Sequence, residues 1–196
     1  MEIEDEKEEL RKSLGLSSLG HTFDNYKVLP GTQEALEAFK GMAEEGCLPL
    51  LLCYGGVGNG KTHLCEALSM ALYKKGIRCK VMVWSDIVRQ LKGSFDSHRE
   101  SHSLPYQFLF NRIRSMSYLI IDDVGMGSSG SEWEWGEFED LTRYRYHEML
   151  FTVVVTNKEL NELPPRVISR FNDPDIGRIV LNRGKDYRKR WITSVQ

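Results

Sequence analysis

The sequence contains few of the features that mark secreted, membrane or metal-binding proteins. It has four cysteines, Cys47, Cys53, Cys65 and Cys79, and no two of them form a Cys-x-x-Cys pair. A disulfide framework or a zinc site needs closer spacing, so buried free thiols in a reducing cytosol are favoured. The longest apolar run, LPLLLCY, is far shorter than the roughly 20 residues that span a bilayer. The acidic start, MEIEDEKEEL, lacks the apolar core of a secretory signal, so we expect a cytoplasmic protein.

Charge of one sign is not in excess either. The formal net charge is −2, with 41% hydrophobic and 28% charged residues over 196 positions, which suits one soluble domain. The small net charge argues against a nonspecific nucleic-acid coat protein, although it is compatible with local basic patches. We expect residues 1–20 to form an acidic N-terminal arm without a core pattern, either a partner-binding segment or a solvated end. Residues 21–196 are expected to form the core domain.

Apolar strand-like stretches alternate with helical stretches along the rest of the chain. Strands are expected at 48–54, 79–84, 118–125, 151–157 and 176–182. Helices are expected at 32–46, 61–76, 85–95, 104–116, 134–150 and 164–171, with Ser85 as an N-cap. Near-continuous apolar strands that alternate with helices predict an α/β fold, with a parallel sheet covered on both faces.

The stretch GGVGNGKTHL, residues 55–64, has the Gly-x-x-x-x-Gly-Lys-Thr spacing of a phosphate-binding loop between a strand and a helix. Such a turn exposes backbone N–H groups and directs a helix N-terminus at the phosphates, and glycine leaves room for the approach. Lys61 is expected to reach the β- and γ-phosphates of ATP, and Thr62 to offer a hydroxyl to Mg²⁺. The alternative, an accidental glycine-rich turn, is disfavoured by the flanking elements. The expected nucleotide-binding residues here are Gly55, Gly56, Gly58, Asn59, Gly60, Lys61, Thr62 and His63.

Polar residues follow two of the other expected strands. YLIIDDVG ends in Asp122, expected as a magnesium partner, and Asp123, placed to orient or deprotonate the attacking water. Asn157 ends FTVVVTN and would stand near that water, although a plain turn residue is an alternative for an asparagine.

These motifs, in order with RVISRF and GKDYR, resemble the AAA+ ATPases of the DnaC/DnaI helicase-loader and IstB transposition-helper group. The resemblance implies a P-loop three-layer sandwich with a five-stranded parallel sheet, without room for a C-terminal lid domain. It also implies that Asn157 is the sensor-1 residue and that Arg170 is an arginine finger completing a neighbouring subunit's site. Arg188 would be the sensor-2 arginine. From the residues alone, Arg170 could instead lie on a solvated helix face, and Arg188 in a nonspecific basic tail.

The same resemblance implies contacts with single-stranded DNA. Phe95 matches a family aromatic, and Ser131 with Trp133 matches a Ser-x-Tyr pair in which tryptophan replaces tyrosine. Aromatic rings stack on bases while basic side chains follow the phosphates. Lys92, with Arg89, Arg112 and Arg114, is a candidate phosphate contact. A core position is the alternative for Phe95.

The leading expectation is an ATP-dependent helicase-loader ATPase that uses ATP and Mg²⁺, binds single-stranded DNA, self-associates and contacts a replicative helicase. Three alternatives stay open: an IstB-like helper acting on duplex DNA, a small-molecule P-loop kinase, and a noncatalytic nucleotide-gated binding protein.

Overall fold

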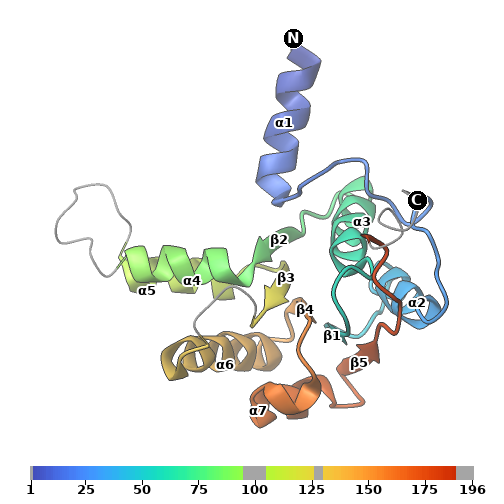
Figure 1. Cartoon of the computed structure of the whole chain (residues 1–196). Helices are drawn as coiled ribbons and strands as arrows, with labels where there is room; N and C mark the ends of the chain where they lie inside the picture. The colour runs from blue at the N-terminus through green and yellow to red at the C-terminus, as the bar shows by residue number, and fades with distance from the viewer. Residues whose placement is uncertain (1, 95–104, 126–129, 189–196) are drawn as a thin grey trace, which may run out of the picture.

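Five parallel strands form the centre of the domain. The computed structural model describes residues 2–94, 105–125 and 130–188. The strands are β1 (Leu50–Tyr54), β2 (Lys80–Val83), β3 (Tyr118–Val124), β4 (Phe151–Thr156) and β5 (Gly177–Leu181). They pair in the order β2-β3-β4-β1-β5, every pair parallel, so β2 and β5 are the edges (Figure 1). The expected five-stranded parallel sheet is confirmed.

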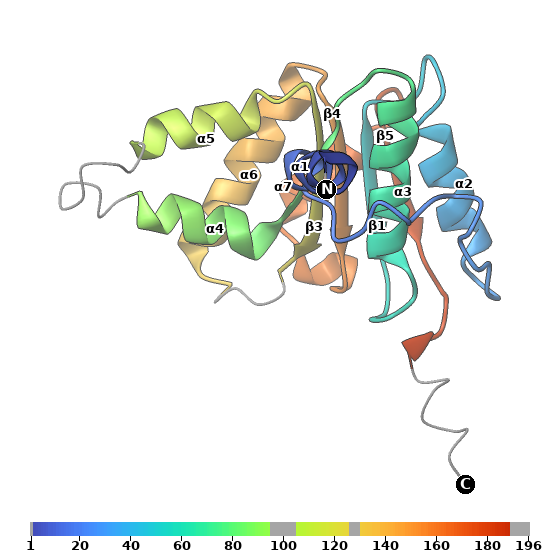
Figure 2. The ribbon, with the colours of Figure 1, turned by 90° about the horizontal axis from the view of Figure 1, so that it is seen from above.

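Helices cover both faces of this sheet, as its apolar strands require (Figure 2). On one face lie α2 (Gln33–Gly41) and α3 (Lys61–Lys74). On the other lie α4 (Trp84–Gly93), α5 (Tyr106–Arg114), α6 (Glu132–His147) and α7 (Pro165–Phe171), with a short 3₁₀ turn at Leu160–Glu162. Each face has its own apolar cluster, one centred on α2 and α3 and the other on α4 to α7. The expected α/β three-layer sandwich is therefore confirmed.

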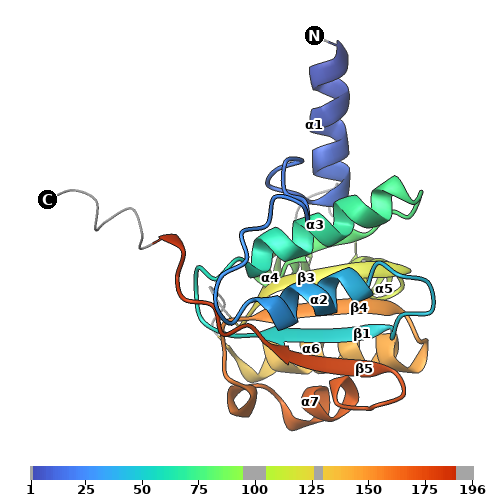
Figure 3. The ribbon, with the colours of Figure 1, turned by 90° about the vertical axis from the view of Figure 1, so that its right-hand side faces the viewer.

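The N-terminal segment departs from expectation. Helix α1 (Glu2–Leu14) projects from the domain (Figure 3), but Leu14 and Leu16 are buried in the core beneath it. Gly15, at φ 73°, ends the helix in a Schellman motif, in which its N–H donates to Lys12 O and Leu16 N–H to Arg11 O. A segment without core contacts was thus the wrong expectation for residues 14 and 16. The division of the chain at residue 20 stays a prediction.

The start of α4 also differs from the sequence prediction. The helix begins at Trp84, with Val83 rather than Ser85 in the N-cap position. Trp84 is buried against α6, where its ring meets Phe138 edge to face, and this packing draws it into the first turn.

Candidate functional site

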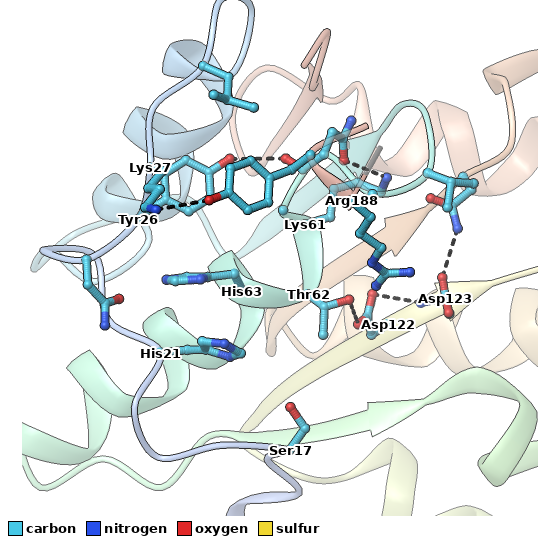
Figure 4. Close-up of a pocket in the computed structure, with 18 residues that line it drawn as sticks. Ser17, His21, Tyr26, Lys27, Lys61, Thr62, His63, Asp122, Asp123 and Arg188 are labelled. Carbon is cyan, nitrogen blue, oxygen red and sulfur yellow. Dashed lines mark hydrogen bonds between the residues drawn. The ribbon is translucent and has the colours of Figure 1, made fainter. Parts of the chain in front are cut away.

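A pocket of about 540 Å³ lies at the ends of β1, β3 and β4, where parallel strands commonly present functional loops. The loop after β1, the acidic end of β3 and the residue after β4 all line it (Figure 4). These segments are far apart in the chain. The sheet order brings them to one edge because β1 lies next to β4, and β4 next to β3.

The glycine-rich loop adopts a conformation that its glycines permit. Gly58 and Gly60 have φ values of 74° and 90°, and Gly60 caps the N-terminus of α3. A Cβ at Gly60 would lie 2.8 Å from the Tyr26 ring, and one at Gly58 would lie 1.9 Å from a carboxylate oxygen of Asp186. Side chains are therefore excluded at both positions.

Lys61 is held inside this loop. Its ammonium donates to Gly55 O at 2.9 Å, Gly56 O at 2.6 Å and Asn59 Oδ1 at 3.0 Å. Lys61 is buried, and burial lowers its pKa. The amide of Asn59 is buried as well and donates to Asn182 O, so Asn59 braces the loop from within. A buried ammonium held only by neutral oxygens is suited to an anionic ligand.

Thr62 and Asp122 meet beside that lysine. The Thr62 hydroxyl donates to Asp122 Oδ2 at 2.7 Å. Asp122 is buried, and burial raises the pKa of its carboxyl group. A hydroxyl and a carboxylate are hard oxygen donors of the kind that Mg²⁺ prefers, so this pair fits the expected metal.

Asp123 is turned toward the pocket by an irregularity in the sheet. Pairs on either side place Asp122 and Asp123 of β3 opposite the single residue Val155 of β4, so the ladder bulges there. Asp123 adopts φ 56°, a left-handed conformation that aspartate tolerates better than most residues. Asn157 Nδ2 donates to Asp123 Oδ1 at 2.9 Å, so these two predicted catalytic residues touch.

The pocket wall that the sequence interpretation missed comes from residues 17–29. Ser17, His21, Asn25, Tyr26 and Lys27 all line the pocket, as does Tyr187 from the C-terminal end. No motif marks these residues, because they are brought to the site by packing against α3, the glycine-rich loop and Tyr187. The turn residues Asn25 and Gly31 could have marked an ordered loop, but not its position.

His63 also faces this wall. Its Nε2–H donates to Thr22 O at 2.9 Å, and its ring stacks on His21 with centroids 4.4 Å apart. Burial lowers the pKa of His63. The structure thus gives His63, expected as a nucleotide contact, a role in holding the wall at the rim of the pocket.

The two remaining arginines are in different places. Arg188 lines the pocket and points into it (Figure 4), while its backbone N–H donates to Asp186 Oδ1 at 3.0 Å. Arg170 lies on α7 outside the pocket, with its guanidinium 3.5 Å from Glu139 O, and burial lowers its pKa. The structure therefore brings together all the predicted catalytic residues except Arg170.

The candidate DNA contacts are largely engaged within the domain. Lys92 pairs with the buried carboxylate of Glu134 at 2.7 Å and lies over the Trp133 ring, 5.5 Å from its centroid. The Ser131 hydroxyl accepts Glu134 N–H and caps α6. Phe95 lies outside the described residues. Of the other candidate basic residues, Arg89 is exposed and paired with Asp86, Arg112 is exposed, and Arg114 stacks on Tyr144.

Among residues 2–94, 105–125 and 130–188, no helix is long and apolar enough to cross a membrane. The same residues contain no cluster of three histidine, cysteine or acidic side chains that could hold a metal ion. Thr62 and Asp122 would supply two oxygen ligands, as is usual where a magnesium ion is shared with nucleotide phosphates.

Residues 18–176 match the family described as the bacterial DnaA ATPase domain. The chain belongs to this family. It is 29% identical over 175 residues to the chromosomal replication initiator DnaA of Mycoplasma pneumoniae, covering 86% of this chain and 39% of that protein. With DnaA of Bordetella petrii it shares 33% over 165 residues, covering 77% and 32%. The chain thus spans about a third of the length of these DnaA relatives.

Solved structures agree on the fold. A DnaA bound to AMPPCP and single-stranded DNA superposes with a TM-score of 0.68 at 25% identity, covering 83% of this chain and 49% of that one. The DnaC helicase loader gives 0.67 at 22% identity, covering 83% and 97%. The AAA+ fold is confirmed, and the family shown is that of the DnaA ATPase domain. Membership of the narrower DnaC/DnaI and IstB group that the motifs suggested stays a prediction.

Proposed function

We propose that this chain binds ATP with Mg²⁺ in the described pocket and hydrolyses it as the ATPase of a replication-initiation protein. The observation that carries the proposal is the convergence of Lys61, the Thr62–Asp122 pair and the Asp123–Asn157 pair on one pocket. Membership of the DnaA ATPase family supports the same activity.

The residues of this chain divide the work. Lys61 would exchange its loop carbonyls for phosphate oxygens. Thr62 and Asp122 would hold the metal ion, which would neutralise developing charge on the phosphates. Asp123 orients the attacking water and accepts its proton. Asn157 keeps the Asp123 carboxylate in place, and Arg188 balances phosphate charge from the opposite wall.

Hydrolysis in this scheme requires a second copy. Because Arg170 lies outside its own pocket, it is free to serve the pocket of a neighbour, and the chain would self-associate when ATP is bound. An arginine supplied in trans raises phosphoryl-transfer rates by about 10³–10⁵. Self-association would in turn bring several copies onto one stretch of single-stranded DNA.

We further propose that the chain contacts single-stranded DNA and a replicative helicase in the manner of a loader. Support comes from the DnaA neighbour bound to single-stranded DNA, and from the DnaC fold, which this chain covers almost completely. Lys92, Trp133 and Ser131 stay candidates for that contact, as does Phe95. The cytoplasmic location also stays a prediction.

The decisive experiment measures ATP turnover against protein concentration, with and without single-stranded DNA. The specific activity of the wild type should rise with concentration and with DNA. Arg170→Ala should bind ATP normally and lose that stimulation by about 10³-fold. Arg178→Ala, at an exposed arginine on β5 that is paired with Glu34 rather than with a pocket residue, is the matched control.

Turnover that is independent of concentration and is stimulated by a small-molecule acceptor would instead favour a kinase. Assembly on duplex DNA in preference to single strands would favour a transposition helper. ATP binding without turnover at any concentration would leave a nucleotide-gated binding protein.

A further inference from the structure

The segment of residues 15–29, here the N-terminal linker, joins α1 to the core along the nucleotide pocket. It leaves α1 at β2, follows α3, and reaches the glycine-rich loop before the chain turns into α2 (Figure 3). Both ends of the linker are attached by specific contacts.

The first half is attached to α3 through Glu66. This carboxylate is buried and accepts the Ser17 N–H at 2.6 Å on one oxygen and the His21 ring on the other. A buried carboxylate is costly unless such donors satisfy it, so its position depends on the linker. The mechanism described above makes no use of Glu66.

The second half is attached to the glycine-rich loop. His21 stacks on His63, and the Tyr26 ring meets His63 edge to face at 5.3 Å. The Tyr26 hydroxyl donates to Asn59 O at 3.2 Å, and its ring lies against Gly60. A movement of the glycine-rich loop on nucleotide binding would therefore displace linker residues that contact it.

The near end of the linker holds α1 on the edge strand β2. A Cβ at Gly15 would lie 2.0 Å from Val81 O, and Lys80 Nζ donates to the α1 carbonyls of Lys12 and Ser13, each at 2.8 Å. Beyond these contacts and Leu14, the charged residues of α1 from Glu4 to Lys7 are exposed. The docking of α1 thus rests on a few contacts at its base.

We propose that the N-terminal linker is a strap that couples occupancy of the nucleotide pocket to the docking of α1 on β2. Bound nucleotide completes the wall formed by His21, Tyr26 and Lys27, which steadies the linker and, through Glu66 and Gly15, the base of α1. The inference rests on the proposed nucleotide site. Coupling of this kind is reciprocal, so the factor by which nucleotide strengthens the docking of α1 equals the factor by which docked α1 strengthens nucleotide binding.

The test measures hydrogen exchange of residues 10–17 in the full chain, with and without saturating Mg²⁺·ADP, together with the Kd for ADP. In the wild type, ADP should slow exchange there by at least about fivefold. Gly15→Ala, which places a Cβ against Val81 O, should raise the Kd, and complete undocking of α1 should raise it by the factor by which ADP slows exchange in the wild type. Gly41→Ala, at a helical glycine with open space around it, is the control and should leave both values unchanged.

Two further variants keep the test decisive if Gly15→Ala does not fold. Lys80→Met removes both hydrogen bonds to the end of α1 without touching the pocket, and should raise the Kd in the same direction. Glu66→Gln should abolish the effect of ADP on residues 10–17.

ADP that binds the wild type without changing exchange at residues 10–17 overturns the strap alone. An unchanged Kd in a variant whose faster exchange at residues 10–17 shows that α1 has undocked does the same. Failure of ADP to bind, or equal binding by Lys61→Ala, overturns the proposed nucleotide site as well, so the two failures are distinguishable.

Discussion

At the scale of single residues, the pocket combines groups that are costly to bury with the contacts that hold them there. Lys61 and Asp122 are both buried. Burial lowers the pKa of Lys61 and raises the pKa of Asp122, so it favours the neutral form of each. Buried ionisable groups lower the stability of a domain, and functional sites commonly carry this cost.

The pair of Asp123 and Asn157 gives a sharp prediction at this scale. Asn157→Ala removes the donor that holds the Asp123 carboxylate, so a misplaced base should slow ATP hydrolysis about 10- to 100-fold. The Kd for ATP should stay close to that of the wild type. Single-turnover kinetics with a fluorescent-nucleotide binding assay separate the two quantities.

Asn161→Ala, at an exposed asparagine in the 3₁₀ turn, provides the comparison and should change neither quantity. An equal loss of ATP affinity and hydrolysis in Asn157→Ala would show instead that Asn157 shapes the pocket as a whole.

At the scale of elements, a buried arginine links α6 to its neighbours at the end of the sheet opposite the pocket. Arg145 of α6 is completely buried and donates to Thr152 Oγ1 and to three backbone carbonyls, those of Arg114, Met116 and Phe151. Burial lowers its pKa to about 10. The planar guanidinium meets four acceptors at once, which tie α6 to the end of α5, to the loop before β3 and to the start of β4.

Arg145→Lys should therefore lower the free energy of unfolding by about 2–4 kcal/mol, because a point-charge ammonium cannot satisfy the same acceptors. Urea unfolding measures the change. Arg143→Lys, two residues earlier at an exposed position paired only with Asp140, should cost less than about 0.5 kcal/mol. Equal effects of the two substitutions would contradict the structural role of Arg145.

At the scale of the whole molecule, the reactivity of the four cysteines tests whether the core excludes solvent. Cys53, Cys65 and Cys79 are buried in the cluster beside α2 and α3, whereas Cys47 is partly exposed. Burial raises the pKa of Cys53 and Cys79 to about 12, and raises those of Cys65 and Cys47 as well.

Native protein at pH 8 should thus react with iodoacetamide at Cys47 alone, and faster as the pH rises toward 9 and beyond, because the thiolate is the reactive form. Denatured protein should react at all four cysteines. Mass spectrometry after proteolysis identifies the sites, and rapid labelling of Cys65 in the native protein would contradict the described core.

Local patterns determined a large part of this protein. Continuous apolar runs such as LLLCY and FTVVVT indicated buried parallel strands, since only strands covered on both faces lack polar alternation. The spacing of the glycine-rich loop identified Lys61 and Thr62, and the end of YLIIDDV identified Asp122 and Asp123. The glycine-rich loop can be found from a short stretch of sequence because phosphate binding depends on consecutive backbone N–H groups.

Tertiary structure alone decided the rest. The wall of Ser17, His21 and Tyr26 reaches the pocket through contacts with α3 and the glycine-rich loop, and no local pattern encodes a contact across more than 30 residues. The same holds for the bulge that turns Asp123 toward Asn157, which arises where two residues of β3 stand opposite one residue of β4. Sequence by itself thus determined which groups are candidates for the chemistry, and packing between distant segments decided how those groups are held, because only packing places them side by side.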